Sequence, residues 1–332
     1  MNVARWLGPI VAIVIAALPF AVKAYQLDFL IFLFINVIVV VSYRLVTITG
    51  EWSLSHVVIM GVGAYASAIG TKQLGLPVLA AMPIAGLASA LIAYVLSFPL
   101  FRMKGFYFLI GSFAAGEAIR LTWSRFRFPF GGPKGITMIP APELPIPGFG
   151  TVSLGTPVIY YFMTVVIVVL CLWVMYRLER SKIGLTLEAI HWKDVLAESV
   201  GIDTWRYRTL SFVTASFFAG IGGSLLGHYI GTINPDRFGM ESMLYVLVWT
   251  IVGGTRTFYG PIIGVVVLSI LDEVFRGLAE LRPALYGVLL IATMRFLPNG
   301  LESLPEVFSM VRGRLRTRTD RAPAASPDVS AE

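Results

Sequence analysis

The chain has 332 residues, of which 57% are hydrophobic and only 14% are charged. This composition excludes an ordinary soluble domain, because apolar runs recur along nearly the whole chain and soluble domains carry about 25% charged residues. The net charge of +7 would suggest nucleic-acid binding in a soluble protein. In a chain this apolar, membrane orientation explains the basic residues better, so we expect no nucleic-acid partner.

The longest apolar runs predict the fold class. Residues 27–46, 76–101 and 157–176 each reach the about 20 residues that a helix needs to cross the hydrocarbon core. They lack the alternation of a lipid-facing barrel strand, and spanning backbone must satisfy its own hydrogen bonds. The sequence therefore predicts an all-α polytopic membrane protein with about 8–10 transmembrane helices, the lower number applying if two short segments are re-entrant.

Residues 1–24 combine a basic start, an apolar stretch and a small residue after Lys23. These features loosely resemble a signal peptide. An uncleaved first helix near 6–22 agrees better with the orientation of the other helices, so we expect the segment to remain as the first crossing.

Lysine and arginine residues gather in three places: 102–104, 177–208 and the C-terminal tail. The positive-inside rule places all three in the cytoplasm, which requires an even number of crossings between them. Ten crossings satisfy this condition and place both termini in the cytoplasm. We expect residues 1–311 to form the transmembrane domain and residues 312–332 to form a disordered cytoplasmic tail.

Residues 50–70, GEWSLSHVVIMGVGAYASAIG, are apolar enough to cross a membrane but rich in polar and small residues. Small residues let helices approach or break, and polar groups at membrane depth face protein or water. A second interrupted segment, 251–264, lies late in the chain, and paired broken segments point to a solute route in transporters. The alternative is that the glycines serve helix packing alone. The candidate pathway residues are Ser53, Ser55, His56, Gly61, Gly63, Tyr65, Glu117, Gly253, Gly254, Gly260, Pro261 and Gly264.

Isolated ionisable residues in these segments allow two readings. Glu117 lies inside the predicted crossing 106–123, where a charge costs about 2.5–3.5 kcal/mol on insertion scales. Arg120 lies on the same helix face and can pair with it, so both pairing and a place in the polar route stay open. His56 and His228 lie near helix ends, where neither ring needs to be dehydrated and boundary roles are expected.

Two polar stretches separate the apolar runs. Residues 121–156 are rich in proline and glycine and predict turns and extended chain on the periplasmic side. Residues 178–208 predict one short amphipathic helix that ends at Gly201, and Asp203 or Thr204 can cap the helix that follows. The apolar stripe of the amphipathic helix consists of Trp192, Val195, Leu196 and Val200. That stripe must be covered, either by membrane lipid or by a cytoplasmic partner.

Six motifs in order resemble the LivM-type permease subunit of ABC importers for branched-chain amino acids. They are GEWSLSHVVIMGVGAY, GGPKG, RSKIGLTLEAI with AESVGID, FFAGIGGSLLGHYIGTINPDRF, IVGGTRTFYGPIIG and LYGVLLIATMRFLPNGL. The resemblance covers about residues 27–303. Ser55 stands where that family usually has glycine, and Val195 and Leu196 stand where its coupling loop usually has alanines.

The resemblance implies half of a translocation pore in a bacterial inner membrane. Its partners would be a second homologous permease, two ABC ATPase subunits, a periplasmic substrate-binding protein and membrane lipid. The implied substrates are branched-chain or other hydrophobic amino acids, with urea, short amides or another small carboxylate as the alternative. The implied ATPase-coupling residues, in the cytoplasmic loop 178–208, are Glu188, Ala189, Trp192, Val195, Leu196, Ala197 and Gly201.

Other function classes fit less well. Three histidines and one cysteine, Cys171, are scattered, and no Gly-x-Ser-x-Gly occurs, so no catalytic, metal-binding or cofactor-binding set is predicted. The chain also lacks a Gly-x-x-x-x-Gly-Lys-[Ser/Thr] loop, so ATP would be bound by another subunit. A proton-coupled secondary carrier could use Glu117 as its titrating group, but it would not need a coupling helix.

Overall fold

The computed structural model describes residues 17–146, 150–297 and 299–304. Its longer helices are α2 (Ala24–Thr47), α3 (His56–Leu74), α4 (Val78–Leu100), α5 (Phe106–Arg125), α6 (Pro157–Glu179), α9 (Thr204–Ile230), α10 (Met240–Gly253), α11 (Gly260–Val274) and α12 (Arg282–Phe296). Shorter helices are α7 (Lys182–Trp192), α8 (Asp194–Ser199), η1 (Gly132–Lys134), η2 (Pro235–Phe238), η3 (Arg276–Leu281) and η4 (Leu301–Ser303). Most of the first predicted crossing, near 6–22, and the tail 312–332 lie outside the described residues.

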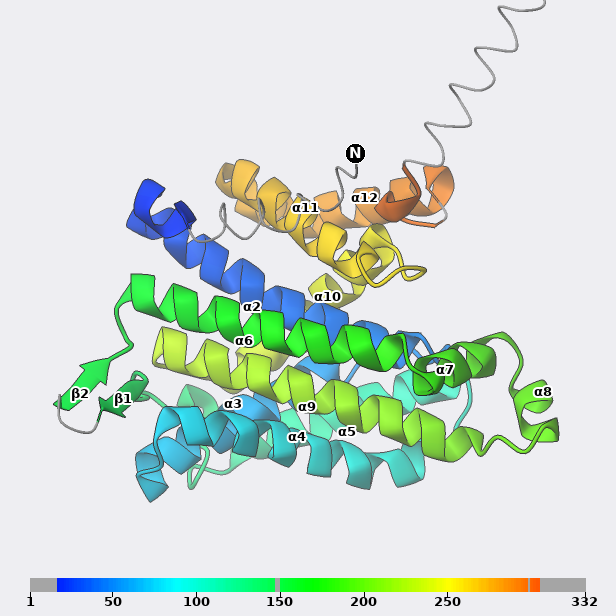
Figure 1. The fold of residues 1–332 in the computed structure, drawn as a ribbon, viewed down its shortest axis with the longest axis horizontal. Helices are drawn as coiled ribbons and strands as arrows, with labels where there is room; N and C mark the ends of the chain where they lie inside the picture. The colour runs from blue at the N-terminus through cyan, green and yellow to red at the C-terminus, as the bar shows by residue number, and fades with distance from the viewer. Residues whose placement is uncertain (1–16, 147–149, 298, 305–332) are drawn as a thin grey trace, which may run out of the picture.

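The long helices lie side by side in a bundle with two distinct ends (Figure 1). Strands β1 (Glu143–Ile146) and β2 (Gly150–Ser153) form an antiparallel hairpin at one end, with Leu144 opposite Val152. Helices α7 and α8 lie at the other end. We call these the hairpin end and the α7–α8 end. Helices α11 and α12 lie on one side of α2, and α3, α4 and α5 lie on the other. Helix α10 packs against both α2 and α11.

The all-α polytopic class predicted from the sequence is confirmed. Helices α2, α4, α6 and α9 are long and apolar enough to cross a membrane. Helices α3 and α5 have 19 and 20 residues but include more polar side chains. Helices α10, α11 and α12 have only 14, 15 and 15 residues, shorter than the about 20 that a perpendicular crossing requires.

The outer surfaces of α4 and α6 are apolar. Leu87, Leu91 and Val95 on α4, and Val166 and Leu170 on α6, are all more than half exposed. Contiguous apolar surface of this kind is typical of contact with lipid or with another subunit rather than with water.

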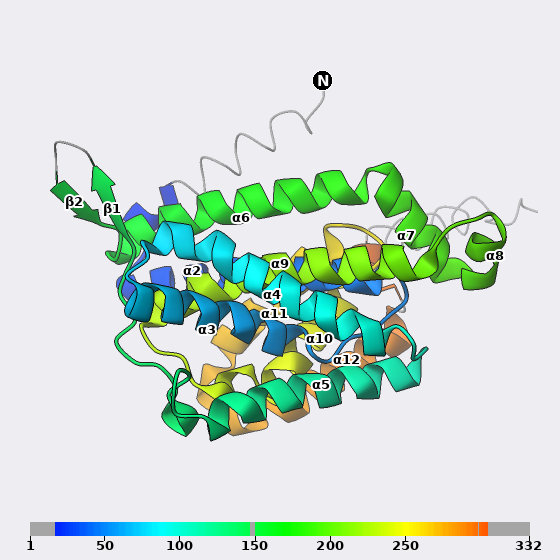
Figure 2. The ribbon, with the colours of Figure 1, turned by 90° about the horizontal axis from the view of Figure 1, so that it is seen from below.

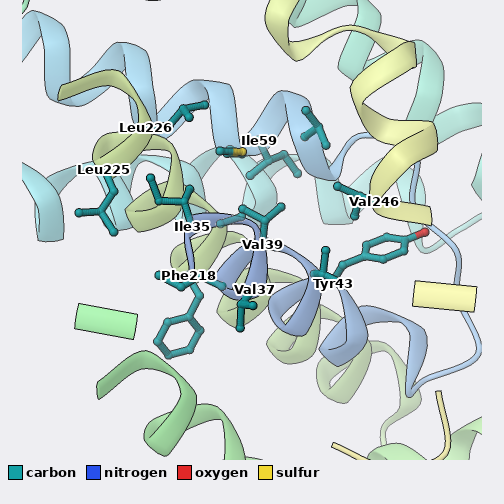
Figure 3. Packing of buried hydrophobic residues seen from close by; sticks show 14 of the residues in the cluster. Ile35, Val37, Val39, Tyr43, Ile59, Phe218, Leu225, Leu226 and Val246 are labelled. Atoms are coloured by element: carbon teal, nitrogen blue, oxygen red, sulfur yellow. The ribbon is translucent and has the colours of Figure 1, made fainter. Parts of the chain in front are cut away.

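Helix α2 occupies the centre of the bundle. Ile35 and Ile38 are fully buried, and Val37 and the residues from Val39 to Val46 are nearly so, because other helices pack around this part of α2. Figure 3 shows Ile35 and Val39 of α2 packed with Ile59 of α3 and with Leu225 and Leu226 of α9. An α-helix that is hydrophobic all round is expected to be buried in this way.

The segment 121–156 begins with the last turn of α5 and continues as turns, η1 and the β-hairpin. Gly131, Gly132 and Gly135 have positive φ angles of 84°, 64° and 70°, which favour glycine. They turn the chain so that Ile136 pairs by a backbone bridge with Ile233, just after α9. The glycine motif therefore fixes this segment to the rest of the bundle.

Helices α3 and α9 approach each other through small residues. A Cβ atom added to Gly63 would collide with the backbone of Gly220, and one added to Gly223 would collide with the carbonyl group of Met60. Small residues at such contacts allow backbones to pack closely in membrane proteins. The views in Figures 1 and 2 agree in placing α3 and α9 side by side.

This contact predicts the effect of one added methyl group. Gly63→Ala should lower the free energy of unfolding by about 1–3 kcal/mol, because two backbones must separate to admit it. Thermal unfolding of the purified protein in detergent measures the change. Gly287→Ala is the matched control, since a Cβ atom at this helical glycine would meet no other atom within 4 Å. Equal unfolding temperatures for the two variants would contradict the packing described here.

Candidate functional site

The loop between α2 and α3 carries a buried polar cluster. Ser53, Ser55 and His56 are fully buried, and the Ser53 and Ser55 hydroxyl oxygens lie 2.9 Å apart. His56 Nε2 lies 2.9 Å from Ser42 Oγ on α2. His56 is the first residue of α3, at a helix boundary as the sequence indicates, but its ring is buried beside the Tyr43 ring at 5.2 Å between centroids. Among the described residues, His56 Nδ1 has no hydrogen-bond partner.

The glycine-rich part of α3 is an unbroken helix that faces other protein groups. A Cβ atom on Gly61 would lie 2.7 Å from Phe238 Cγ and 2.8 Å from the Trp123 ring. The Tyr65 ring stacks on Trp123 at 4.5 Å between centroids and is almost completely buried. Gly61, Gly63 and Tyr65 therefore contact α5, η2 and α9 in this conformation, and their place in a solute pathway stays a prediction.

Glu117 forms the ion pair that its spacing from Arg120 allows. The Arg120 guanidinium donates hydrogen bonds to both carboxylate oxygens of Glu117. It also lies 3.0 Å from the Asp236 carboxylate, which connects α5 to η2. The Glu117 and Arg120 side chains are 29% and 20% exposed, so the pair lies near the surface of the chain.

His228 lies at the hairpin end of α9 and joins two neighbouring segments. Its Nε2 atom is 2.7 Å from Ser67 Oγ on α3, and its Nδ1 atom is 2.8 Å from the Pro140 carbonyl oxygen. These contacts agree with the structural, boundary role expected for this histidine.

The predicted interruption in 251–264 is present, because α10 ends at Gly253 and α11 begins at Gly260. Gly254 has a φ angle of 106°, and a Cβ atom on Gly264 would collide with the Trp249 carbonyl oxygen. Pro261 fits at the start of α11, where a missing N–H group costs nothing. The Glu302 carboxylate accepts hydrogen bonds from the backbone N–H groups of Arg256 at 2.7 Å and Thr257 at 2.9 Å.

A buried arginine holds the same loop from the other side. Arg44 on α2 lies 2.8 Å from the Glu179 carboxylate at the end of α6. Its Nε atom donates to the Thr257 carbonyl oxygen at 2.8 Å, and its Nη2 atom donates to the Arg256 carbonyl oxygen at 3.2 Å. Arg44 therefore connects α2, α6 and the loop between α10 and α11 at the α7–α8 end.

The prediction of one amphipathic helix in 178–208 is wrong. Lys193 has extended backbone angles (φ −157°, ψ 97°) and separates α7 from α8. Trp192, Val195, Leu196 and Val200 are 76%, 77%, 61% and 71% exposed, so the apolar residues form a bare patch across both helices.

The neighbouring residues in this segment have varied positions. Glu188 and Ala189 lie on the exposed side of α7, while Ala197 is buried. Gly201 follows α8 with a φ angle of 87°, and the Asp203 carboxylate caps α9 by accepting from Arg206 N. Gly201 therefore ends α8 and Asp203 caps α9, as the sequence predicts.

The break at Lys193 coincides with an ion pair that fixes α8. Arg208 Nη2 on α9 donates to both carboxylate oxygens of Asp194, at 2.9 and 2.8 Å, and lies 3.3 Å from Glu51 Oε1. The Arg208 and Glu51 side chains are only 9% and 5% exposed. Burial raises the pKa of Glu51, and the attraction of Arg208 opposes this shift. Arg208 thus joins α8 to the loop that carries Ser53 and Ser55.

Known proteins resemble this chain along most of its length. Residues 25–297 match the family model described as "Branched-chain amino acid transport system / permease component". The chain belongs to this family. No solved structure matches it significantly.

Two permease proteins resemble most of the chain, and a third resembles part of it. The permease protein LivM of Salmonella typhimurium is 28% identical, covering 93% of this chain and 76% of that protein. LivM of Escherichia coli is 27% identical over 94% of this chain and 77% of that protein. LivH of Escherichia coli is 28% identical over 39% of this chain and 42% of its own length. These relatives are permease proteins of transport systems, and this chain is likewise a permease component.

The family match identifies no site residues, and the structure brings together several that sequence patterns did not single out. Arg44, Asp194 and Arg208 form the main polar connections at the α7–α8 end. The sequence shows the basic residues Arg44 and Arg208 but not their ion pairs. The positive-inside rule by itself accounts for basic residues near the end of a membrane helix, so these two did not stand out. Among the described residues, no group of three or more His, Cys, Asp or Glu side chains could hold a metal ion.

The Arg208 cluster predicts a large effect of one substitution. Arg208→Gln should lower the free energy of unfolding by about 3–5 kcal/mol, because it leaves a buried carboxylate without its partner. Asp194→Asn in the same background should cost much less than it does in the parent protein, which a double-mutant cycle in detergent measures.

Arg206→Gln is the control for this cycle. Arg206 pairs with Asp203 on the same helix, but its side chain is 78% exposed, so its loss should change stability by less than about 1 kcal/mol. Equal losses for Arg206→Gln and Arg208→Gln would show that the buried cluster has no special role.

Proposed function

We propose that this chain is the permease subunit of an ABC importer for branched-chain or other hydrophobic amino acids and forms half of its translocation pore. The observation that carries the proposal is the family match along most of the chain, together with the similarity to two LivM proteins. Urea, short amides or another small carboxylate are the alternative substrates, because the motifs alone do not distinguish them.

The proposed complex includes a second, related permease, two ATPase subunits and a periplasmic substrate-binding protein. The similarity to LivH, a permease of the same kind of transport system, supports a related partner subunit. The lack of a phosphate-binding loop supports ATP hydrolysis in separate subunits. The exposed apolar residues of α4 and α6 support contact with membrane lipid.

In the proposed orientation, the termini and the α7–α8 end are cytoplasmic and the hairpin end is periplasmic. Basic residues support it, since Arg102, Lys104, Arg177, Arg180 and Lys182 all belong to helix ends and turns at the α7–α8 end. Residues 1–311 would then form the permease domain, with 121–156 outside and both 178–208 and the tail 312–332 inside.

The glycine-rich start of α3 and the break between α10 and α11 are proposed to border the solute route. Both segments combine small residues with polar groups, as a backbone that changes shape at membrane depth requires. Their close packing in this conformation corresponds to a closed route in the proposal. Glu117 would then border the route as an ion-paired rather than a titrating group.

The exposed patch of Trp192, Val195, Leu196 and Val200 is proposed to dock in a groove on the ATPase. Bare apolar side chains at the end of a short helix are typical anchors for helix-in-groove contacts. Arg208 then links the docked helix α8 to Glu51 and so to the start of α3. This connection would carry movement of the ATPase into the membrane.

Uptake by vesicles that carry the whole complex tests the proposed substrate. Labelled leucine, isoleucine and valine should enter in an ATP-dependent manner, and labelled urea and acetamide should not. We expect uptake of these amino acids rather than of urea, because the chain resembles permeases named for branched-chain amino acid transport. Uptake of urea without uptake of leucine would replace the proposed substrate with the alternative.

The docking patch predicts a separate result. Leu196→Asp should abolish co-purification of the ATPase subunits and uptake, because it places a charge in an apolar contact. Lys193→Asp also adds negative charge to this segment, but off the patch, and should retain both. Normal co-purification and uptake with Leu196→Asp would favour a helix that lies on lipid instead.

A further inference from the structure

A cavity of about 500 Å³ lies between α2, α10 and α11 toward the hairpin end. Its size falls within the range of about 300–1,000 Å³ that is usual for small-molecule sites. The cavity lies apart from the buried polar cluster at the start of α3. Its walls include both charges and large apolar side chains, so their arrangement indicates what it can bind.

Two carboxylates come from the end of α11. The Tyr286 hydroxyl donates to the Asp272 carboxylate, and the Tyr25 hydroxyl donates to Glu273 Oε2 at 2.6 Å. Both side chains lie in the cavity wall. Each has acceptor capacity beyond its single tyrosine partner, since a carboxylate accepts about four hydrogen bonds.

Two guanidinium groups balance these carboxylates. Arg237 reaches the cavity from η2, and Arg276 follows α11 with its guanidinium 4.4 Å above the Tyr25 ring centre. Among the described residues, neither arginine lies within 4.0 Å of a carboxylate. The cavity wall therefore contains two positively charged and two negatively charged side chains. In the described part of the chain, these side chains form no ion pairs with one another.

The remaining wall is mainly aromatic and aliphatic, with Asn36 and Ser269 as further polar residues. Phe29, Phe32 and Leu33 of α2 lie along one side, and Trp249 of α10 lies along another. Such surface gains about 25 cal/mol for each Å² that a ligand's apolar group covers.

We propose that this cavity is an amino-acid-binding site at the periplasmic entrance of the permease. The α-ammonium group would bind at Asp272 and Glu273, the α-carboxylate at Arg237 and Arg276, and the side chain against the α2 aromatic residues. The assignment rests on the proposed function for its orientation and extends it by naming the recognising groups. A zwitterion satisfies both charge signs at once, whereas urea or a simple carboxylate would leave charges in the cavity unmatched.

The test measures binding of labelled leucine to the permease–ATPase complex without the substrate-binding protein. The complex is placed in nanodiscs of phosphatidylglycerol, because this lipid has no ammonium group that could replace that of leucine. Unlabelled leucine should compete, while 4-methylpentanoate, which lacks the ammonium group, and 3-methylbutylamine, which lacks the carboxylate, should compete at least about tenfold more weakly.

Variants provide the second part of the test. Asp272→Asn and Arg237→Gln should each weaken leucine binding by about tenfold or more. Arg237 lies on the exposed side of η2, so its variant tests the site even if Asp272→Asn impairs folding. Glu143→Gln removes an exposed carboxylate from the hairpin and should leave binding unchanged.

The outcomes separate this proposal from the proposed function. Leucine uptake by the parent complex, with unchanged leucine binding by Arg237→Gln or equal competition by both analogues, would overturn the cavity assignment alone. Absence of leucine uptake, with uptake of urea, would overturn the proposed substrate as well.

Discussion

The close contact between α3 and α9 is the constraint on which the other features depend. Gly63 faces Gly220, and Gly223 faces Met60, so neither helix can slide past the other without breaking backbone packing. Helix α2 lies buried beside this pair. Polar groups at either end of α3 are therefore held in fixed relation to α9.

The polar contacts at the two ends of the bundle have different characters. At the α7–α8 end, Arg44 and Arg208 are nearly buried and connect segments that are far apart in the sequence. At the hairpin end, Arg120 and the charged cavity groups are more exposed. In the proposed importer, the first end would carry force from the ATPase and the second would receive solute. A buried ion pair suits the transmission of force, because breaking the pair costs several kcal/mol. The two segments that it joins therefore move together.

Sequence patterns predicted the features that depend on local chemistry. Gly201 and Asp203 marked a helix end and a helix start, and the glycines of 251–264 predicted the break before α11. The i,i+3 spacing allowed the Glu117–Arg120 pair that the structure contains. Each of these depends on neighbours within a few residues. The membrane class followed from composition alone.

The same patterns missed features that depend on which helices become neighbours. Glu51 and Arg208 lie far apart in the sequence, and hydrophobic periodicity does not state that α9 passes the loop before α3. The break between α7 and α8 lies next to the Arg208–Asp194 ion pair, another contact between residues that an apolar stripe in the sequence does not reveal. The burial of His56 was missed for a related reason, since its position at a helix end does not reveal that the Tyr43 ring lies against it.

If α8 acts on α3 through Arg208, as proposed, the ratio of ATP hydrolysed to leucine imported should depend on the Asp194–Arg208 ion pair. In vesicles with the complete complex, Asp194→Asn should release α8 from Arg208 while leaving the docking patch intact. ATP hydrolysis should then continue while leucine uptake falls, so that the ratio of ATP hydrolysed to leucine imported rises several-fold. An unchanged ratio with normal uptake would contradict a link between α8 and α3 through Arg208.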